Sequence, residues 1–171
     1  MEKTRIGFAM CGSFCTFEPA MEQLHLLAEQ GHKILPIMSK TASETDTRFG
    51  RASDFIWELE DTCHHKVIKT IAEAEPIGPK HLVDLMVVAP CTGNTLAKLS
   101  WGITDTPVTM AVKSSLRIGL PVVLALATND ALAASAQNLG RLLNVKNLYF
   151  VPLRQDNPEK KPTSLVCDFS Q

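Results

Sequence analysis

Short apolar runs alternate with segments of helical spacing along the chain. An apolar run of about four to eight residues is typical of a buried strand, whereas apolar residues three and four positions apart predict the buried face of a helix. Strands are predicted over residues 5–10, 33–38, 85–89, 121–127 and 148–151. Helices are predicted over residues 17–30, 54–61, 67–74, 96–101, 107–117 and 131–143. This alternation indicates an α/β fold, a three-layer, doubly wound parallel sheet in a single domain.

Local signals set the boundaries of these elements. Gly31 ends the first helix, because glycine readily adopts the left-handed conformation that follows a helix. Pro90 ends the third strand, because proline has no N–H group to donate to a neighbouring strand. Asp105 is expected to cap the next helix, with Pro107 in its first turn. The polar residues 39–53 are predicted to form a long loop.

Composition and charge restrict the class of protein. The 171 residues carry a formal net charge of -1, so no overall field attracts nucleic acid or an acidic membrane surface. No stretch reaches the ~20 apolar residues of a membrane span, and the chain opens on a strand without a signal peptide. Five cysteines without a C-x-x-C pair favour reduced thiols in the cytoplasm. Residues 1–153 are expected to form the α/β domain, and 154–171 a tail that is either a partner-docking segment or a disordered end.

The segment after the third strand has the pattern of an anion site. Thr92, Gly93, Asn94 and Thr95 follow the apolar run, and Leu96 then begins a helical spacing. The N–H groups and the dipole at a helix start both favour negative charge. A single N-cap would need only one of these polar side chains, and here three stand beside a glycine. The pattern favours a ligand site and leaves a simple cap at Thr92 or Asn94 as the alternative.

Polar residues follow four of the predicted strands, and the carboxyl ends of parallel strands meet at the edge where such sheets bind ligands. These exits are residues 12–13, 39–41, 92–95 and 128–130. The chain contains neither G-x-G-x-x-G nor G-x-x-x-x-G-K-[ST], which disfavours a dinucleotide site and a P-loop. Gly12 followed by the hydroxyl of Ser13 suits a monophosphate better.

Two of these exits resemble the flavoprotein family that includes the flavin-containing cysteine decarboxylases. Residues 89–98, Ala-Pro-Cys-Thr-Gly-Asn-Thr-Leu-Ala-Lys, are similar to the family's Pro-x-[Ser/Thr]-x-Asn-Thr-x-x-Lys segment, and Gly12-Ser13 and residues 102–105 add to the likeness. The resemblance covers nearly the whole chain and implies a flavodoxin-like or Rossmann-like flavoprotein fold that binds flavin mononucleotide (FMN). The FMN contacts that it implies, with Ser39 added from its place after a strand, are Gly12, Ser13, Ser39, Thr92, Asn94, Thr95 and Asn129. For Ser13 and Asn129 a helix cap is the alternative.

A second set of segments is similar to one branch of this family, sporulation proteins of endospore-forming bacteria that form one half of a two-component oxidoreductase. These segments are residues 12–16, 46–50, 75–80, 128–132, 155–158 and 161–162. The resemblance implies a small dicarboxylate substrate oxidised to an aromatic ring, with NAD(P) bound by the partner subunit. It also implies a homo-oligomer in the mother-cell cytoplasm and a further helix beyond Gln171. An FMN-dependent cysteine decarboxylase and a non-catalytic subunit with a vestigial flavin pocket are the alternatives.

The sequence identifies few catalytic candidates. Asn129 stands where the decarboxylases carry Pro-x-Met-Asn, although here the segment reads Leu-Ala-Thr-Asn, and it could orient a substrate carboxylate or the flavin edge. Arg48 could pair with a carboxylate through two hydrogen bonds. Isolated histidines are more often surface residues than proton relays, so none is assigned to catalysis. The run Cys63-His64-His65 lacks the spaced partners of a metal site, and no metal is predicted.

Overall fold

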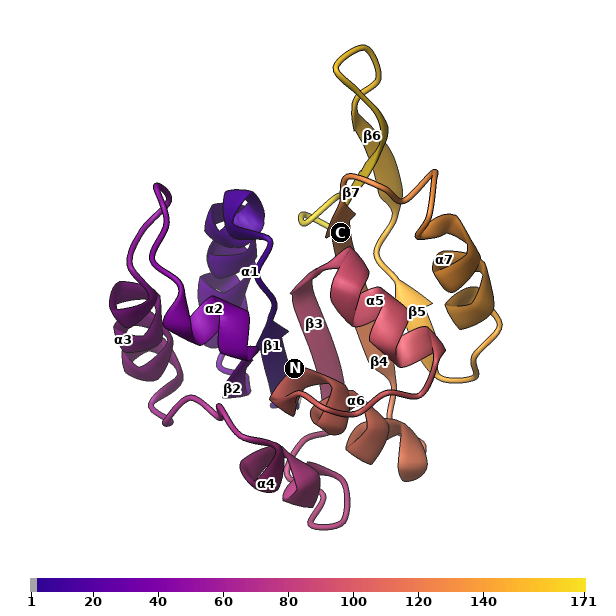
Figure 1. The fold of residues 1–171 in the computed structure, drawn as a ribbon. Coiled ribbons are helices and arrows are strands. Elements are labelled where there is room, and N and C mark those ends of the chain that lie inside the picture. The colour runs from indigo at the N-terminus through magenta and orange to yellow at the C-terminus, as the bar shows by residue number, and fades with distance from the viewer. Residues whose placement is uncertain (1–2) are drawn as a thin grey trace.

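The computed structural model describes residues 3–171, which form a seven-stranded sheet with helices on both faces (Figure 1). The strand order is β2-β1-β3-β4-β7-β6, and β5 also pairs with β4. The strands are β1 (Arg5–Met10), β2 (Lys33–Met38), β3 (Leu85–Cys91), β4 (Val122–Thr128), β5 (Leu148–Phe150), β6 (Leu153–Asn157) and β7 (Lys161–Cys167). Because β1 lies between β2 and β3, the chain builds outward on one side and then on the other, which confirms the doubly wound α/β fold.

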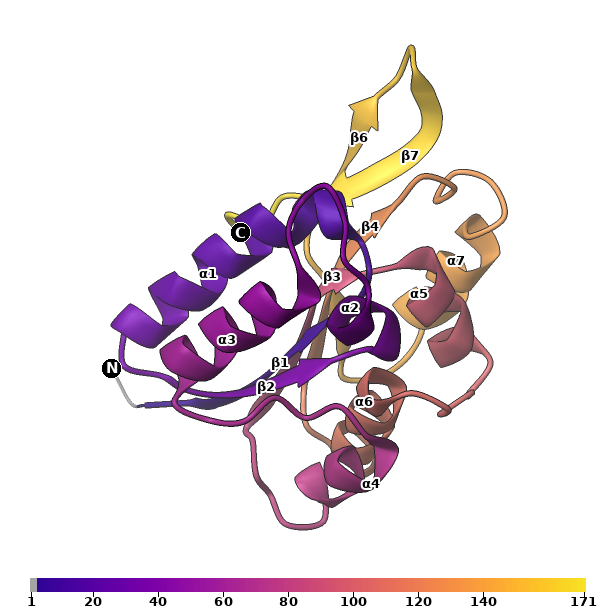
Figure 2. The ribbon, with the colours of Figure 1, turned by 60° about the vertical axis from the view of Figure 1, so that its left-hand side comes forward.

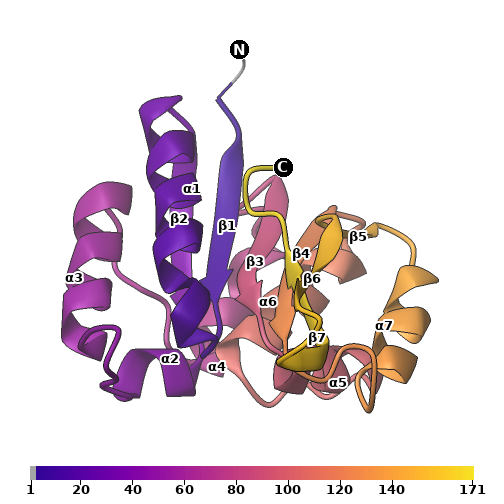
Figure 3. The same cartoon turned by 90° about the horizontal axis from the view of Figure 1, so that it is seen from above.

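Helices cover the two faces of the sheet in separate layers (Figure 2 and Figure 3). The first face carries α1 (Phe17–Glu29) and α3 (Ala52–Cys63). The opposite face carries α4 (Ile71–Ala74), α5 (Gly93–Ser100), α6 (Pro107–Arg117) and α7 (Ala136–Leu143). The short helix α2 (Lys40–Glu44) follows β2 directly, and the 3-10 helices η1 (Phe14–Thr16) and η2 (Glu75–Ile77) precede α1 and follow α4.

Alternate residues of each central strand feed two hydrophobic cores, as the period of two in a strand requires. In β1, Phe8 and Met10 pack with α1 and α3, whereas Ala9, and Cys11 directly after the strand, pack with the helices of the opposite face. Residues of β4 divide in the same way. Because both faces are buried, the strands read as continuous apolar runs, which is why the sequence located them well.

Pro90 does not end the third strand, contrary to the prediction. Strand β3 runs to Cys91, with a register shift against β4 between Val88 and Cys91 and a cis peptide bond between Ala89 and Pro90. The carbonyl oxygen of Pro90 accepts a hydrogen bond from the Cys11 N–H group at 3.1 Å. A proline is tolerated at this irregular position, where the sheet needs its carbonyl group and not an N–H group.

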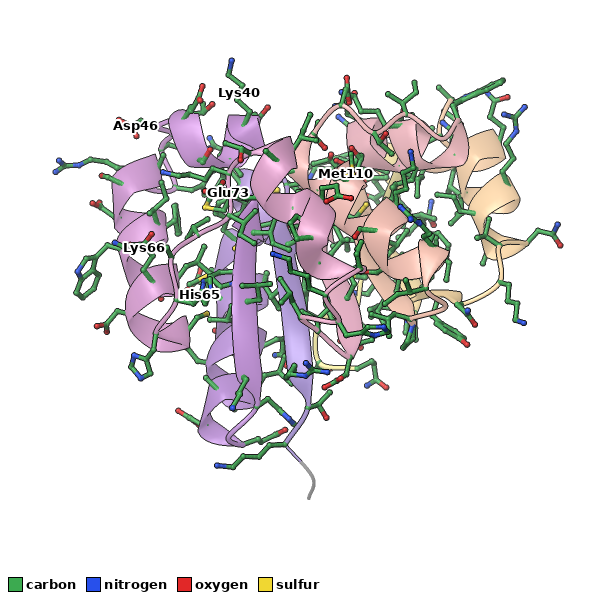
Figure 4. The ribbon with its side chains drawn as sticks, turned by 90° about the horizontal axis from the view of Figure 1, so that it is seen from below. Lys40, Asp46, His65, Lys66, Glu73 and Met110 are labelled. Carbon is green, nitrogen blue, oxygen red and sulfur yellow. The ribbon has the colours of Figure 1, made fainter. Side chains whose placement is uncertain are left out.

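The loop predicted over residues 39–53 contains a helix. Ser39 caps α2, because its hydroxyl oxygen accepts a hydrogen bond from the Ala42 N–H group at 3.2 Å. The side chain of Lys40, in the first turn of α2, points outward into solvent (Figure 4). The next helix, α3, is longer than predicted because the Asp46 carboxylate accepts a hydrogen bond from the Ala52 N–H group and holds the chain at its start.

Two other predicted helices begin later in the structure, and a third begins as predicted but has a different cap. Residues 67–68 are extended, since Ile68 forms a bridge with Ile37 beside β2, and only Ile71–Ala74 is helical. Helix α6 is capped by Thr106, whose side chain forms a capping box with Thr109, and not by Asp105. Helix α7 begins at Ala136 and not near residue 131.

The segment predicted as a tail, residues 154–171, is ordered for most of its length as the hairpin β6-β7, so the expectation of a disordered end is not met. Strand β7 pairs antiparallel with the end of β4, through Ala127 and Thr128, so the sheet is mixed and not wholly parallel. The hairpin projects beyond the carboxyl edge of the parallel strands (Figure 1). Within residues 3–171, no helix combines the length and apolar character needed to cross a bilayer.

Candidate functional site

The principal cavity lies at the carboxyl edge of the sheet and has a volume of about 780 Å³. Its floor consists of the residues that follow β1, β3 and β4. One wall is formed by η1 and a loop tip at residues 47–50, and the other by the hairpin β6-β7. The position agrees with the rule that open parallel sheets bind ligands beyond the carboxyl ends of their strands, and the volume is that of small-molecule sites.

The exit of β1 places backbone and hydroxyl groups on this cavity. Gly12 is required there, because a side chain would place its Cβ atom 2.9 Å from the Thr41 methyl group. Ser13 follows, and its oxygen atoms accept hydrogen bonds from the Thr16 hydroxyl, at 2.8 Å to the carbonyl and 3.1 Å to Oγ. Ser13 makes no capping hydrogen bond from its side chain, so the helix-cap alternative does not describe it.

The exit of β3 leads directly into α5. The Thr92 hydroxyl oxygen caps this helix by accepting a hydrogen bond from the Thr95 N–H group at 3.2 Å, so the capping alternative is correct for Thr92. The Thr95 hydroxyl donates to the Cys11 sulfur at 3.2 Å and is buried. The first helical N–H groups, at Gly93 and Asn94, lie ahead of the first hydrogen bond within α5 and are the groups of a helix start that favour an anion.

The exit of β4 is held against the start of α5 by a close approach at Gly93. A Cβ atom there would lie 2.6 Å from the Thr128 hydroxyl and 3.1 Å from both the Asp130 carboxylate and the Ser135 hydroxyl. The Asp130 carboxylate accepts hydrogen bonds from both hydroxyls, at 2.6 Å and 2.9 Å. Asn129, which lies between Thr128 and Asp130 in the sequence, lines the cavity. It does not cap α7, because that helix begins only at Ala136.

Arg48 and Phe49 reach the cavity from the tip of a tight turn. Thr47 and Gly50 exchange two backbone hydrogen bonds, at 3.0 Å and 3.2 Å, so the two residues between them stand at the tip. The Arg48 guanidinium carbon lies 4.9 Å from the centre of the Phe49 ring. Gly50 has a φ of 148° and packs on the Phe55 ring, which itself packs edge-on against Phe17 of the core.

The opposite wall was not predicted as part of the site. Asp156, Lys161 and Ser164 line it from the hairpin, together with Leu165 and Val166. Lys161 donates a hydrogen bond to the Asp156 carboxylate at 2.5 Å, which raises the pKa of the lysine. Pairing of β7 with β4 brings these residues to the cavity, and such a non-local contact leaves no periodic signal in the sequence. The only signal available was the family likeness of residues 155–158 and 161–162.

The cavity brings together some of the residues predicted for FMN and leaves others apart. Gly12, Ser13, Thr92 and Asn129 line it. Ser39, Asn94 and Thr95 do not: Ser39 caps α2, Asn94 is exposed, and Thr95 is buried against Cys11. The catalytic candidates Arg48 and Asn129 lie on the same cavity.

The histidine and cysteine residues limit the chemistry that the cavity can carry out. No histidine of residues 3–171 lines the cavity, and no three side chains in that range gather as a metal site would require. Burial raises the pKa of the Cys11 thiol to about 11, which keeps it protonated below the floor of the site. Cys15 is exposed and lies on the cavity wall.

Comparison with known proteins identifies the family of the chain. The flavoprotein family profile matches residues 1–171, so the chain belongs to the flavoprotein family. Within that family it is similar to the B subunit of dipicolinate synthase from Bacillus subtilis (strain 168), with 44% identity over 163 residues, 95% of this chain and 82% of that protein. The crystal structure of the same B subunit from Bacillus halodurans C superposes with a TM-score of 0.88 and 41% identity, over 98% of this chain and 86% of that one. The crystal structure of Burkholderia xenovorans DmrB in complex with FMN, a cubic protein cage for redox transfer, superposes with a TM-score of 0.69 and 22% identity. The match covers 87% of this chain and 88% of DmrB, and it shows that the two proteins share a fold.

Proposed function

We propose that this chain is the flavoprotein-type subunit of a dipicolinate synthase. With the A subunit of that enzyme, it oxidises a cyclic dihydro- or hydroxytetrahydro-dipicolinate to the aromatic dicarboxylate during endospore formation. The observation that supports the proposal is a cavity at the carboxyl edge of the sheet that joins an anion-favouring helix start to two cationic side chains. The similarity to the B subunit of dipicolinate synthase, at 44% identity, supports the choice of reaction.

The residues of the cavity fit a bound FMN. The hydroxyl group of Ser13 and the N–H group of Gly93 offer donors to a phosphate dianion beside a helix start. Gly12 and Gly93 let the backbone approach closely, since a Cβ atom at either would clash. Bound flavin would supply an acceptor for hydride, which no side chain of the chain can provide.

The chain's own residues would position the substrate and exclude water. Asn129 lies on the cavity with its backbone oxygen fixed by a hydrogen bond from the Thr163 hydroxyl at 2.7 Å, so its side chain can orient a carboxylate or the flavin edge. The A subunit would hold NAD(P). The assembly would include several copies of this chain, as the cage formed by DmrB suggests, and would act in the mother-cell cytoplasm.

The rival reaction, FMN-dependent cysteine decarboxylation, lacks support in the site. It calls for a proton relay, commonly histidine, and no histidine of residues 3–171 lines the cavity. The segment Leu126-Ala127-Thr128-Asn129 also departs from the Pro-x-Met-Asn motif of the decarboxylases. A non-catalytic role in the complex is the other alternative, and the experiment below separates it from an active one.

The test is co-expression of this chain with the A subunit, followed by an assay of dipicolinate formation from the cyclic precursor. FMN binding to the chain is measured separately by quenching of flavin fluorescence. Ser13→Ala is expected to weaken FMN binding about fivefold, the value of a lost hydrogen bond to a partly exposed phosphate. Ser43→Ala is the control, because Ser43 donates only to the Lys40 carbonyl in α2, away from the cavity.

The outcomes are distinct. Activity that requires both proteins and falls with Ser13→Ala supports the proposal. An A subunit that is fully active alone would show that this chain is not part of the catalyst. Dipicolinate synthesis by a complex that binds no FMN would exclude FMN as a cofactor, but the chain would still be a subunit of the synthase.

A further inference from the structure

Two cations reach the cavity from opposite walls, each on the tip of a hairpin-like element. Arg48 stands on the turn at residues 47–50, and Lys161 opens β7 on the projecting hairpin. Both side chains line the one cavity. The chain has a net charge of -1, so two cations facing a single cavity are not a product of a generally basic surface.

The Arg48 tip is built to hold its position. The two backbone hydrogen bonds between Thr47 and Gly50 close the turn, and the Thr47 hydroxyl accepts a third from the Phe49 N–H group at 3.1 Å. The Arg48 guanidinium lies over one face of the Phe49 ring, which is 45% exposed and also lines the cavity. The tip therefore offers a fork of N–H donors next to a flat apolar face, which suits a planar ring that carries a carboxylate.

The Lys161 cation is paired with Asp156, which also lines the cavity. Asp156 accepts one hydrogen bond from Lys161, whose ammonium group has three donors. The two side chains are 55% and 38% exposed, and an ion pair so exposed to water is weak. A ligand carboxylate can thus bind Lys161 through its remaining donors while Asp156 orients the ammonium group.

We propose that Arg48 and Lys161 form a clamp that selects dianionic substrates, each cation binding one carboxylate of a planar ring while Phe49 packs on the ring face. This inference rests on the proposed function and adds to it the residues that distinguish a dicarboxylate from a monocarboxylate. The FMN phosphate is also a dianion, but its donors are at the start of α5 on the cavity floor. The two hairpin tips remain for the substrate.

The test measures binding of pyridine-2,6-dicarboxylate and pyridine-2-carboxylate to the full chain, loaded with FMN, by isothermal titration calorimetry. The variants are Arg48→Gln and Lys161→Gln. Their matched controls are Arg51→Gln and Lys160→Gln, cations three residues and one residue away that do not line the cavity. All four side chains are exposed, and thermal unfolding confirms that each variant folds.

The wild-type chain is expected to bind the dicarboxylate about tenfold more tightly than the monocarboxylate, the value of one additional charge-assisted hydrogen-bonded contact. In either clamp variant the affinity for the dicarboxylate should fall about tenfold. The affinity for the monocarboxylate should fall only about twofold, because a single carboxylate can use the cation that remains. The preference for the dicarboxylate therefore falls from about tenfold to about twofold in each variant and stays at about tenfold in both controls.

Several results would overturn the clamp. One is an unchanged preference in Arg48→Gln and Lys161→Gln, and another is absence of dicarboxylate binding to the wild-type chain. Loss of FMN affinity in both variants, with dicarboxylate binding intact, would assign the two cations to the flavin phosphate instead. Each of these results leaves the co-expression assay to decide the proposed function on its own, and an inactive complex would not alter the binding measurements.

Discussion

Replacement of Gly93 by alanine tests the arrangement of the site most directly. Gly93 begins α5, has an ordinary backbone conformation and touches the exit of β4. The added methyl carbon would lie 2.6 Å from the Thr128 hydroxyl, well inside van der Waals contact. Thr128 and α5 must separate, which breaks the 2.6 Å hydrogen bond from Thr128 to Asp130.

The expected cost follows from these contacts. Overpacking of a tight contact destabilises a protein by about 1–3 kcal/mol. Loss of the Thr128 hydrogen bond adds about 1 kcal/mol, and the better helix propensity of alanine offsets up to about 1 kcal/mol. The net loss is about 2 kcal/mol, which for a domain of this size lowers the Tm by about 4–8 °C.

Gly140→Ala is the matched control. Gly140 lies in α7, and a Cβ atom there meets nothing within 4 Å, so alanine should stabilise the chain by about 0.8 kcal/mol. Urea unfolding of the wild type and both variants, with the m-value checked for each, measures the two effects. If Gly93→Ala proves as stable as Gly140→Ala, the close packing of α5 on the β4 exit is refuted.

Two other measurements test features away from the cavity mouth. Burial raises the pKa of Cys11 from its ordinary 9.0 to about 11, so the stability present below pH 9 should fall as the pH rises towards 11, by about 3 kcal/mol. Urea unfolding at pH 8, 9 and 10.5 should show a smaller fall in Cys11→Ala, and an equal fall would assign the pH dependence to other groups. Thr106→Ala removes the capping box of α6 and should cost about 1 kcal/mol, or about 2–4 °C in Tm. Thr45→Ala, exposed and without a capping bond, is the control, and equal melting of the two variants would contradict the role of the cap.

The sequence predicted the parallel sheet well because its strands are buried on both faces. The apolar runs of β1 and β4 stand out, and their lengths exclude long helices. The same reasoning failed at the hairpin β6-β7. Residues such as Arg154, Gln155 and Asp156 are exposed, so the strand carries no apolar alternation, and only its pairing with β7 makes it a strand.

Caps and turn residues were predicted less well because neighbouring polar side chains compete. Asp105 and Thr106 are both residue types that cap helices well. Thr106 is the cap because Thr109, three residues later, completes a capping box with it, whereas Asp105 forms an ion pair with Lys98. Asp130 holds the turn before α7 by binding the hydroxyl groups of Thr128 and Ser135, which delays the helix. Arg48 was proposed from a polar loop and Asn129 from a strand exit and a family motif, and both line the cavity. Lys161 reaches the cavity only because β7 pairs with β4, a strand far away in the sequence.

The cavity draws its walls from residues 12–16 and from residues 156–166, separated by almost the whole length of the chain. A nascent chain that has folded as far as β5 possesses the parallel strands and most of both cores, but it has no enclosed site. A ligand that contacts both walls therefore binds most tightly to molecules in which β7 has docked on β4, and at saturating concentration it stabilises those molecules over partly folded ones. Ligand binding to both walls thus favours completed folding, and a chain that lacks the hairpin β6-β7 is expected to bind the ligand more weakly.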